Sequence, residues 1–563
     1  MSEQQEQHTR NTAEFLVECL EAEGVEYIFG IPGEENIAIM EAIRRSKIKF
    51  VLTRHEQGAA FMADVYGRLT GKAGVCLSTL GPGATNLVTG VADAHSDGAP
   101  LVAITGQVST DRMHITSHQY LDLTKMFEPI TKRSKQIMRA DSVSEIVRIA
   151  FKYAESEKPG ASHIDIPADV AEFPVPDGMR PLIKQTVRKE ISDLSYVEKA
   201  AAEIFKAKRP VILTGSSAVR NKCARALTEF SEKLRIPVVS TMMAKGLVPA
   251  DSEYYVGTVG IPYLDYENIV LDDADLIIAV GYDIVEYAPN KWNHGHHKIV
   301  HIDTRAAHVN KLYQPEVEVV GDISQSLDLI ANRTGAKDIP EFALSVRERI
   351  CGEHDAECAD RSFPPKPARI IGAVRNALGK DDIVISDVGA HKMWMARMYD
   401  CYCPNTCIIS NGFASMGISL PGAIAAKLIN PEKRVIAVCG DGGFMMNNQE
   451  LETAVRLGVP IVILIFNDSH YGLIKWKQED KYGTSCYVDF GNPDFLKMAE
   501  SFGAKGIRVS EEVTVEKALE YAFAQDVPCI IDCPVDYSVN TELSAALKKM
   551  YSEYRSGSLK KEK

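Results

Sequence analysis

Arg434-Val435-Ile436-Ala437-Val438-Cys439-Gly440-Asp441-Gly442-Gly443 is the stretch that decides the fold, together with a later apolar run that ends in Asn467-Asp468. Residues 449–457, between the two runs, carry apolar side chains at helical spacing. The pattern predicts strand, glycine turn, helix and strand, with one carboxylate at the C-terminal end of each strand. In an open parallel sheet those ends face the ligand crevice. Two carboxylates beside glycine amides favour a divalent cation that neutralises a diphosphate, although either aspartate alone could simply cap a helix.

The composition of the chain excludes several classes of protein. Its 563 residues predict three or four domains, and 45% apolar with 25% charged residues is typical of a globular protein. A net charge of −13 gives no basic footprint for nucleic acid. No apolar run is long enough to span a membrane, and the N-terminus lacks a signal region. We therefore expect a cytoplasmic protein without nucleic-acid or membrane partners, whose twelve cysteines are reduced.

Three segments of the chain each alternate apolar strands with amphipathic helices, which is typical of α/β folds with parallel sheets. We predict three doubly wound parallel-sheet domains, at residues 8–180, 190–335 and 366–545. The middle segment lacks a Gly-x-Gly-x-x-Gly turn, and Gly215-Ser216-Ser217-Ala218 is a weak echo of one. The middle domain is therefore expected to be Rossmann-like without a bound nucleotide.

A further carboxylate of interest is Glu56. It closely follows the apolar run Phe50-Val51-Leu52, after Thr53-Arg54-His55, and precedes a helix of small, apolar residues. Taken alone, it could be an ordinary glutamate in the first turn of a helix, where the helix dipole favours a negative charge.

The motifs, taken in order, resemble those of the thiamine diphosphate (ThDP) enzymes of the 2-oxo acid decarboxylase and acetohydroxyacid synthase superfamily. The segments that carry the resemblance are 29–33, 54–63, 81–86, 386–391, 410–417, 440–444 and 467–472. Residues 281–289 and 317–323 are similar to the middle domain of the catabolic acetolactate synthases, which use no FAD. The resemblance covers nearly the whole chain.

This resemblance implies a cofactor site. Glu56 would be the catalytic glutamate that hydrogen-bonds the pyrimidine ring of ThDP. The side chains of Asp441 and Asp468 and the main-chain oxygen of His470 would bind Mg²⁺. The residues at cofactor-contacting positions are Ile31, Pro32, Glu56, Pro82, Asn86, Val388, Gly389, Ala390, His391, Ala414, Met416, Asp441, Gly442, Gly443, Tyr471, Gly472 and Leu473.

The substrate side of the site is less regular. The resemblance places His118, Gln119, Trp476 and Lys477 near the substrate, with Gln119 also a catalytic candidate, although His118 and Gln119 could equally well face solvent. Two stretches depart from the family pattern. Glu34-Glu35 stands where synthases carry small residues or a lysine, and Lys475-Trp476-Lys477 differs from both synthase branches. A carboxylate near a 2-oxo acid anion costs binding energy unless it is paired or points away.

The implied activity is that of a ThDP- and Mg²⁺-dependent acetolactate synthase without FAD. Such an enzyme decarboxylates one pyruvate and joins the remaining two-carbon fragment to a second pyruvate. The alternative on the same scaffold is a non-oxidative 2-oxo acid decarboxylase. A non-enzymatic scaffold role is a third reading, against which Glu56, Asp441 and Asp468 argue. The resemblance also implies a homodimer at minimum and favours a homotetramer.

Overall fold

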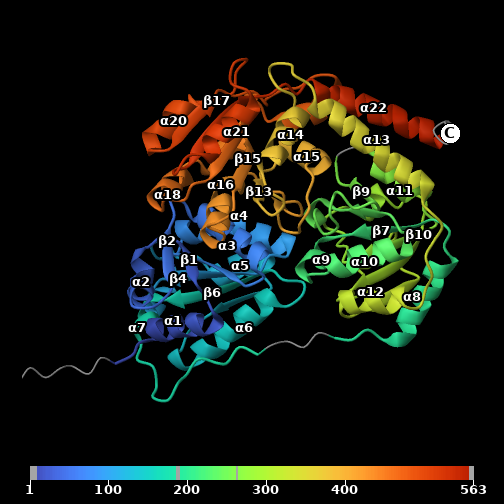
Figure 1. The fold of residues 1–563 in the computed structure, drawn as a ribbon. Helices are drawn as coiled ribbons and strands as arrows, with labels where there is room; N and C mark the ends of the chain where they lie inside the picture. Colours follow the sequence, from blue (N-terminus) through green and yellow to red (C-terminus); the bar gives the residue numbers. More distant parts are fainter. Residues whose placement is uncertain (1–8, 186–189, 262–263, 557–563) are drawn as a thin grey trace, which may run out of the picture. The chain divides into compact units, whose positions relative to one another are not determined.

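The computed structural model of the chain describes residues 9–185, 190–261 and 264–556. It contains three six-stranded sheets, one in each predicted segment (Figure 1). The paired strands run parallel. The predicted α/β class with three parallel sheets is confirmed. The chain forms two compact units: unit 1 comprises Met1–Val187, Ile424–Ile429 and Asn447–Leu457, and unit 2 comprises Arg188–Ala423, Asn430–Met446 and Gly458–Lys563.

Unit 1 is built on a sheet of strand order β2-β1-β3-β4-β6-β5. Every position of β3, β4 and β6 is buried, because helices pack on these long apolar strands. The strands are β1 (Tyr27–Gly30), β2 (Lys49–Leu52), β3 (Gly74–Ser78), β4 (Leu101–Gln107), β5 (Arg133–Gln136) and β6 (Ala161–Pro167). The helices are α1 (Thr12–Glu23), α2 (Ile37–Arg44), α3 (Glu56–Thr70), α4 (Pro82–Asp97), α5 (Leu123–Phe127), α6 (Val143–Glu155), α7 (Ala168–Glu172) and α18 (Glu450–Arg456). α16 (Ser419–Ile429) passes from unit 2 into unit 1 at Ile424.

The middle sheet, in unit 2, has the order β12-β11-β10-β7-β8-β9. Its strands are β7 (Pro210–Thr214), β8 (Val238–Ser240), β9 (Tyr255–Thr258), β10 (Leu276–Val280), β11 (Lys298–Asp303) and β12 (Val317–Val320). The helices that accompany it are α8 (Leu194–Lys206), α9 (Ser216–Arg220), α10 (Ala224–Leu234), α11 (Tyr266–Asp273), α12 (Ile323–Ala331) and α13 (Glu341–Cys358).

The order of this sheet reverses between β7 and β10, the place where dinucleotide folds bind their ligand. Here the buried carboxylate of Glu286 accepts hydrogen bonds from the Ser216 amide (2.8 Å) and the Ser216 hydroxyl (2.7 Å). The Thr241 hydroxyl donates to its other oxygen at 2.5 Å. The chain thus directs a carboxylate of its own to the turn that a nucleotide phosphate would use, and burial raises the pKa of Glu286 to about 7.

The third sheet, also in unit 2, has the order β14-β13-β15-β16-β18-β17. Its strands are β13 (Ile383–Ser386), β14 (Cys407–Ile409), β15 (Val435–Gly440), β16 (Val462–Asn467), β17 (Lys505–Arg508) and β18 (Cys529–Pro534). The helices are α14 (Pro367–Ala377), α15 (Ala390–Met398), α17 (Asp441–Asn447), α19 (Gly472–Tyr482), α20 (Phe495–Phe502), α21 (Val515–Phe523) and α22 (Val539–Arg555). α22 extends beyond the predicted domain end at residue 545.

The opening motif of the sequence folds as the spacing of its residues predicts. β15 and β16 pair in parallel, with Gly440 opposite Phe466. Asp441 and Asp468 therefore stand at the ends of adjacent strands. Among the helices described, none is long and apolar enough to cross a bilayer.

Candidate active site

In unit 1, Glu56 is the first residue of α3 and follows β2 closely. Its side chain is buried, with the residue 8% exposed. The amide nitrogen of Asn86, on α4, donates to Glu56 Oε2 at 2.9 Å. His55 caps α3, because its Nδ1 accepts from the Gln57 amide at 3.1 Å. The structure thus brings together two residues that the sequence analysis places at the cofactor.

The turn before α4 brings the predicted substrate residue to the same place. Gly81 has a φ of +51°, a conformation that favours glycine. A Cβ on Gly81 would lie 2.9 Å from both the Cβ and the carbonyl oxygen of Gln119, and a Cβ on Gly83 would lie 3.2 Å from Glu56 Oε1. The Pro82 turn therefore has Glu56 on one side and Gln119 on the other. Both His118 and Gln119 are exposed in the chain.

Of two buried polar groups missed by the sequence analysis, Gln107 holds the loop that carries Gln119, and Asp165 accepts from Gln107 at 3.5 Å. Gln107, at the end of β4, donates from Nε2 to the carbonyl oxygen of Leu121 at 3.0 Å. Asp165, on β6, accepts from Thr105 at 2.6 Å and from Gln136 at 2.6 Å. Burial raises the pKa of Asp165 to about 6. Only the position of Gln107 at the end of β4 could have marked it in the sequence, and Asp165 lies inside β6.

The backbone before Glu56 is held by a third residue that the sequence analysis missed. Glu450, in the first turn of α18, accepts from the amides of Arg54 (3.1 Å) and His55 (3.0 Å) and from the Thr453 hydroxyl (2.7 Å). Glu450 is fully buried, and burial raises its pKa. A Cβ on Gly58 would lie 2.7 Å from Glu450 Oε1, so this helix approaches α3 closely.

Glu34 and Glu35, the acidic pair that departs from the family pattern, differ in burial and in hydrogen bonding. The Thr79 hydroxyl donates to Glu35 Oε2 at 2.6 Å, and Glu35 is half-buried, whereas Glu34 is exposed. A Cβ on Gly83 would also lie 3.0 Å from Thr79 Cγ2. Thr79, a neutral residue, therefore contacts both the Glu35 carboxylate and the turn at Gly83 that lies beside Glu56. Of the two cofactor candidates beside it, Ile31 donates its amide to Leu77 O at 3.3 Å and Pro32 is exposed.

In unit 2, the two predicted metal ligands lie side by side at the sheet edge. Asp441 is 1% exposed; its Oδ1 accepts from the Gly442 amide at 2.8 Å and its Oδ2 from the Ser469 amide at 2.6 Å. Burial and then the charge of Asp441 raise the pKa of Asp468 to about 7, and burial raises the pKa of Asp441. Two carboxylates that repel each other, one buried and one half-buried, are suited to a bound divalent cation.

The imidazole of His470 is engaged inside the protein. Its Nδ1 donates to the carbonyl oxygen of Asp468, and its Nε2 lies 2.9 Å from Lys475 Nζ and 2.8 Å from Asp489 Oδ1. In the described ranges no group of three or more His, Cys, Asp or Glu side chains could hold a metal. A site here would thus rest on two carboxylates and a main-chain oxygen, as predicted for His470.

The turn at the start of α15 fits a diphosphate. Val388, Gly389 and Ala390 lead into the N-terminus of this nine-residue helix, where backbone amides favour an anion. His391 is buried, and its Nε2 has no hydrogen-bond partner among the residues that the structure describes. Burial lowers the pKa of His391 to about 3, so the ring is neutral. A Cβ on Gly443 would lie 2.9 Å from Asp387 Oδ1, so only a glycine fits this cradle.

Asp387 connects this turn with the loop at residues 410–417. It is fully buried and accepts from the amides of Val388 (2.7 Å) and Gly417 (2.9 Å) and from the Ser419 hydroxyl (2.8 Å). The loop carries Ala414, which has a φ of +60°, and the half-buried Met416. The structure thereby links two segments that the sequence places at the cofactor.

The residues after the metal segment are distributed differently from the sequence prediction. Tyr471 is 41% exposed and packs its ring 4.9 Å from that of Phe490, and the half-buried Gly472 and Leu473 begin α19. Trp476 is 3% exposed, and its indole donates to Ser544 Oγ at 2.8 Å. Trp476 thus packs against α22, and its substrate contact stays a prediction. Lys477 is exposed.

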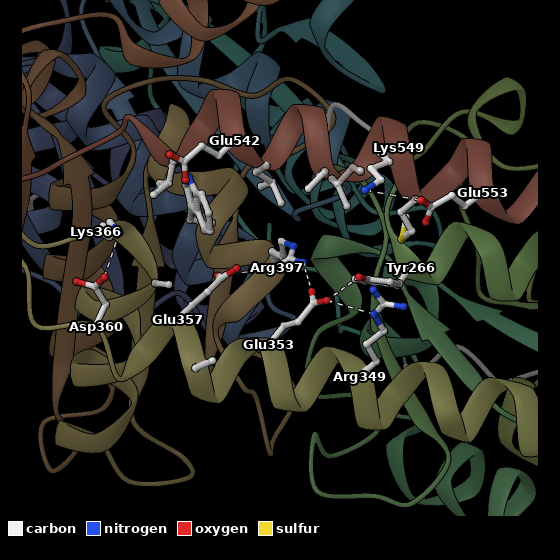
Figure 2. Close-up of a pocket in the computed structure, with 18 residues that line it drawn as sticks. Tyr266, Arg349, Glu353, Glu357, Asp360, Lys366, Arg397, Glu542, Lys549 and Glu553 are labelled. Atoms are coloured by element: carbon white, nitrogen blue, oxygen red, sulfur yellow. Dashed lines mark hydrogen bonds and ion pairs between the residues drawn. The ribbon is translucent and has the colours of Figure 1, made fainter. Parts of the chain in front are cut away.

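A separate cavity of about 610 Å³ lies between α13, α15 and α22 (Figure 2). Its cations already have partners: Arg397 Nε is 2.8 Å from Asp265, Arg349 is 3.3 Å from Glu353, and Lys366 is 3.0 Å from Asp360. None of the predicted site residues is among the residues that line it. We interpret the ion pairs that line this cavity as a structural network.

Comparison with known proteins finds three family models along the chain. Residues 10–129 match the N-terminal TPP binding domain of thiamine pyrophosphate enzymes, residues 197–330 match their central domain, and residues 387–533 match their C-terminal TPP binding domain. Thiamine pyrophosphate (TPP) and ThDP are the same compound. The three matches fall within the three predicted segments.

Several curated relatives align with nearly the whole chain. An acetolactate synthase of Bacillus subtilis (strain 168) is 38% identical over 550 residues, which cover 96% of this chain and 96% of the relative. A catabolic acetolactate synthase of Raoultella terrigena is 36% identical, with 95% and 97% covered. A probable acetolactate synthase large subunit of Methanococcus aeolicus is 36% identical, with 94% and 92% covered.

Proposed function

The chain belongs to the thiamine pyrophosphate enzyme family, in the branch of the acetolactate synthases, and we propose that it is a ThDP- and Mg²⁺-dependent acetolactate synthase. The observation that carries the proposal is the buried Glu56, whose carboxylate accepts a hydrogen bond from the half-buried Asn86. The proposal is supported by relatives that are named acetolactate synthase and that align with this chain over almost their full length. The substrate is then pyruvate, used once as donor and once as acceptor.

When bound, ThDP supplies a ring carbon that attacks the 2-oxo acid and an electron sink for the loss of CO₂. The task of Glu56 is to exchange a proton with the pyrimidine ring of the cofactor. Asn86 orients its carboxylate by donating to Oε2, and Glu450 fixes the backbone on the N-terminal side. A carboxylate held within the protein in this way is preorganised for general acid–base catalysis.

The diphosphate and metal would be held in unit 2. Asp441, Asp468 and the main-chain oxygen of His470 would bind Mg²⁺, which relieves the repulsion between the two carboxylates. The amides at the start of α15 and the unpartnered Nε2 of His391 would contact the diphosphate oxygens. Ala414 and Met416 would support the cofactor from the loop that Asp387 holds.

The acceptor step would depend on Gln119 of unit 1 and Lys477 of unit 2. Gln119, at the Pro82 turn, would contact the second pyruvate, and Lys477 would contribute positive charge. The alternative activity, simple 2-oxo acid decarboxylation, is favoured by Glu35. Its carboxylate has the neutral partner Thr79 and lies near the Glu56 turn, where negative charge disfavours an anionic acceptor.

The remaining properties are also proposals. We propose that the enzyme uses no FAD, because Glu286 takes the amide and hydroxyl donors at the turn after β7. We propose at least a homodimer, and a homotetramer as the working assembly, on the family resemblance. A cytoplasmic location is supported by the twelve cysteines, all of which are free thiols.

The test is a product analysis with pyruvate, ThDP and Mg²⁺ and without added FAD. One acetolactate per CO₂ would support the synthase, since two pyruvates enter and one carboxyl group leaves. Acetaldehyde with little acetolactate would identify the decarboxylase instead. The matched control is the Glu56→Gln variant, which shows how much of either product depends on this site.

A further inference from the structure

One side chain that the sequence analysis did not select contacts the metal segment directly. The strand-like segment 488–490 pairs with residues 469–471: Phe490 donates its amide to Ser469 O at 3.1 Å, and Tyr471 donates its amide to Val488 O at 2.9 Å. An isolated bridge joins His470 and Asp489. This pairing delivers Asn492 to Asp441, from which it is 51 positions away in the chain.

The contacts of Asn492 are all made through its amide nitrogen. Nδ2 donates to Asp441 Oδ2 at 2.8 Å, to Asn467 Oδ1 at 3.0 Å and, at longer range, to Ser469 Oγ at 3.3 Å. Its Oδ1 is buried and has no hydrogen-bond partner in the described part of the chain. Asn492 therefore acts here as a donor.

The orientation of the Asn492 amide is fixed by the groups around it. Asn467 Nδ2 donates to Asp532 Oδ1 at 2.9 Å, so Asn467 turns its oxygen toward Asn492. Asp532 is held in turn by Arg508 Nε at 2.8 Å. An ionised Asp441 only accepts. With an acceptor on each side, a flipped Asn492 would set oxygen against oxygen, so the network permits one orientation.

This network governs how Asp441 is presented. Its Oδ1 accepts from the Gly442 amide, while its Oδ2 accepts from the Ser469 amide and from Asn492. Groups that hydrogen-bond a ligating carboxylate set its rotation and basicity. A neutral amide can do this without placing a competing cation beside the metal.

We propose that Asn492 is a positioning residue for the metal ligand Asp441. The inference rests on the proposed metal site and adds to it the residue that sets the angle of one ligand. Without the Asn492 amide, the Asp441 carboxylate loses one of two donors on Oδ2, and Asn467 Oδ1 loses its donor as well. Loss of such support weakens metal binding by about 10–100-fold.

The test measures metal binding directly. The full-length protein, freed of metal, is titrated with Mn²⁺ in the presence of excess ThDP, and free Mn²⁺ is followed by electron paramagnetic resonance. We expect Asn492→Ala to bind Mn²⁺ about 10–100-fold more weakly than the wild type. At saturating Mn²⁺, the variant should recover the ThDP affinity and the rate of CO₂ release of the wild type, which a misfolded protein would not do.

The matched control is Gln478→Ala. Gln478 Oε1 accepts from the Cys486 amide at 2.8 Å, so this change loosens the chain that leads to the same segment without contacting Asp441. It should bind Mn²⁺ like the wild type.

Three results would overturn the inference. Asn492→Ala could bind Mn²⁺ within about twofold of the wild type, or Gln478→Ala could weaken binding equally, which would assign the effect to the segment rather than to the amide. If the wild type bound no Mn²⁺ with ThDP, the proposed metal site itself would fail, and the role of Asn492 with it.

Discussion

The two units surround their carboxylates in opposite ways. In unit 1, Glu56 stands with the neutral amide of Asn86 at 2.9 Å, and the nearby acid Glu450 is occupied by two backbone amides. In unit 2, Asp441 and Asp468 lie together, and their burial and mutual repulsion raise the pKa of Asp468 to about 7. The first arrangement suits a group that passes a proton, and the second suits a group that needs a cation.

The largest expected effect comes from Glu56→Gln, which keeps the shape of the side chain but removes its acid–base function. We expect acetolactate formation to fall by at least the ~10²–10⁴-fold that is typical for a general acid–base group. ThDP and metal should still bind, because the ligands in unit 2 are unchanged. Steady-state product assays and ThDP titration measure the two effects separately. Retained turnover would remove Glu56 from the mechanism.

In unit 2, Asp441→Ala should weaken metal binding more than Asp468→Asn. The first change removes both oxygens of a ligand that is held by Gly442 and Ser469. The second keeps an oxygen ligand and relieves the repulsion that Asp468 now experiences. For Asp441→Ala we expect the metal affinity to fall by more than the ~10–100-fold that is typical when a residue supporting a ligand is lost. For Asp468→Asn we expect a loss of metal affinity of less than about tenfold. Calorimetric titration with Mg²⁺ in excess ThDP measures both affinities. A larger loss of affinity in Asp468→Asn would contradict the view that Asp441 is the stronger metal ligand.

A smaller effect is expected from Gln107→Leu in unit 1. It removes the bond to the Leu121 carbonyl and loosens the loop that carries Gln119. A hydrogen bond of about 1 kcal/mol corresponds to a shift of roughly fivefold in the ratio of acetolactate to acetaldehyde. Gln136→Leu is the control, because it removes a bond to the same Asp165 without contacting the loop. Equal ratios in the two variants would argue against a role of Gln107 in placing Gln119.

The last prediction concerns stability rather than catalysis: it involves Glu286, whose ordinary pKa of 4.5 burial raises to about 7. Between pH 4.5 and 7 the folded protein binds more protons at this group than the unfolded chain does. Its contribution to the free energy of unfolding therefore falls as the pH rises, by up to about 1.4 kcal/mol per pH unit. Glu286→Gln should flatten this part of a plot of melting temperature against pH. A profile parallel to that of the wild type would contradict the assignment.

The comparison also shows how far sequence reasoning reaches. The strand-ending residues Asp441 and Asp468 were predictable, because each follows a strand-length apolar run. The place of Glu56 at the start of α3 was predicted in the same way, whereas its catalytic role was implied by the family resemblance. These positions follow from the local spacing of apolar residues, which can be read directly from the sequence.

The supporting residues were not predictable. Asn492, Glu450 and Gln107 reach their partners through tertiary contacts across 51, 395 and 14 positions, for which no local pattern exists. Tertiary contacts also determine the surroundings of Trp476. Its indole, on α19, donates to Ser544 of α22, a contact that the sequence does not indicate.

The most direct test of this division of roles is hydrogen–deuterium exchange at the reactive ring carbon of bound ThDP, followed by proton NMR after rapid quenching. With metal and cofactor saturating, Glu56→Gln should slow the exchange by about 100-fold or more, while Asp468→Asn should exchange at nearly the wild-type rate. Wild-type exchange in Glu56→Gln, or an equal loss in both variants, would contradict the assignment of proton transfer to unit 1 and of metal and diphosphate binding to unit 2.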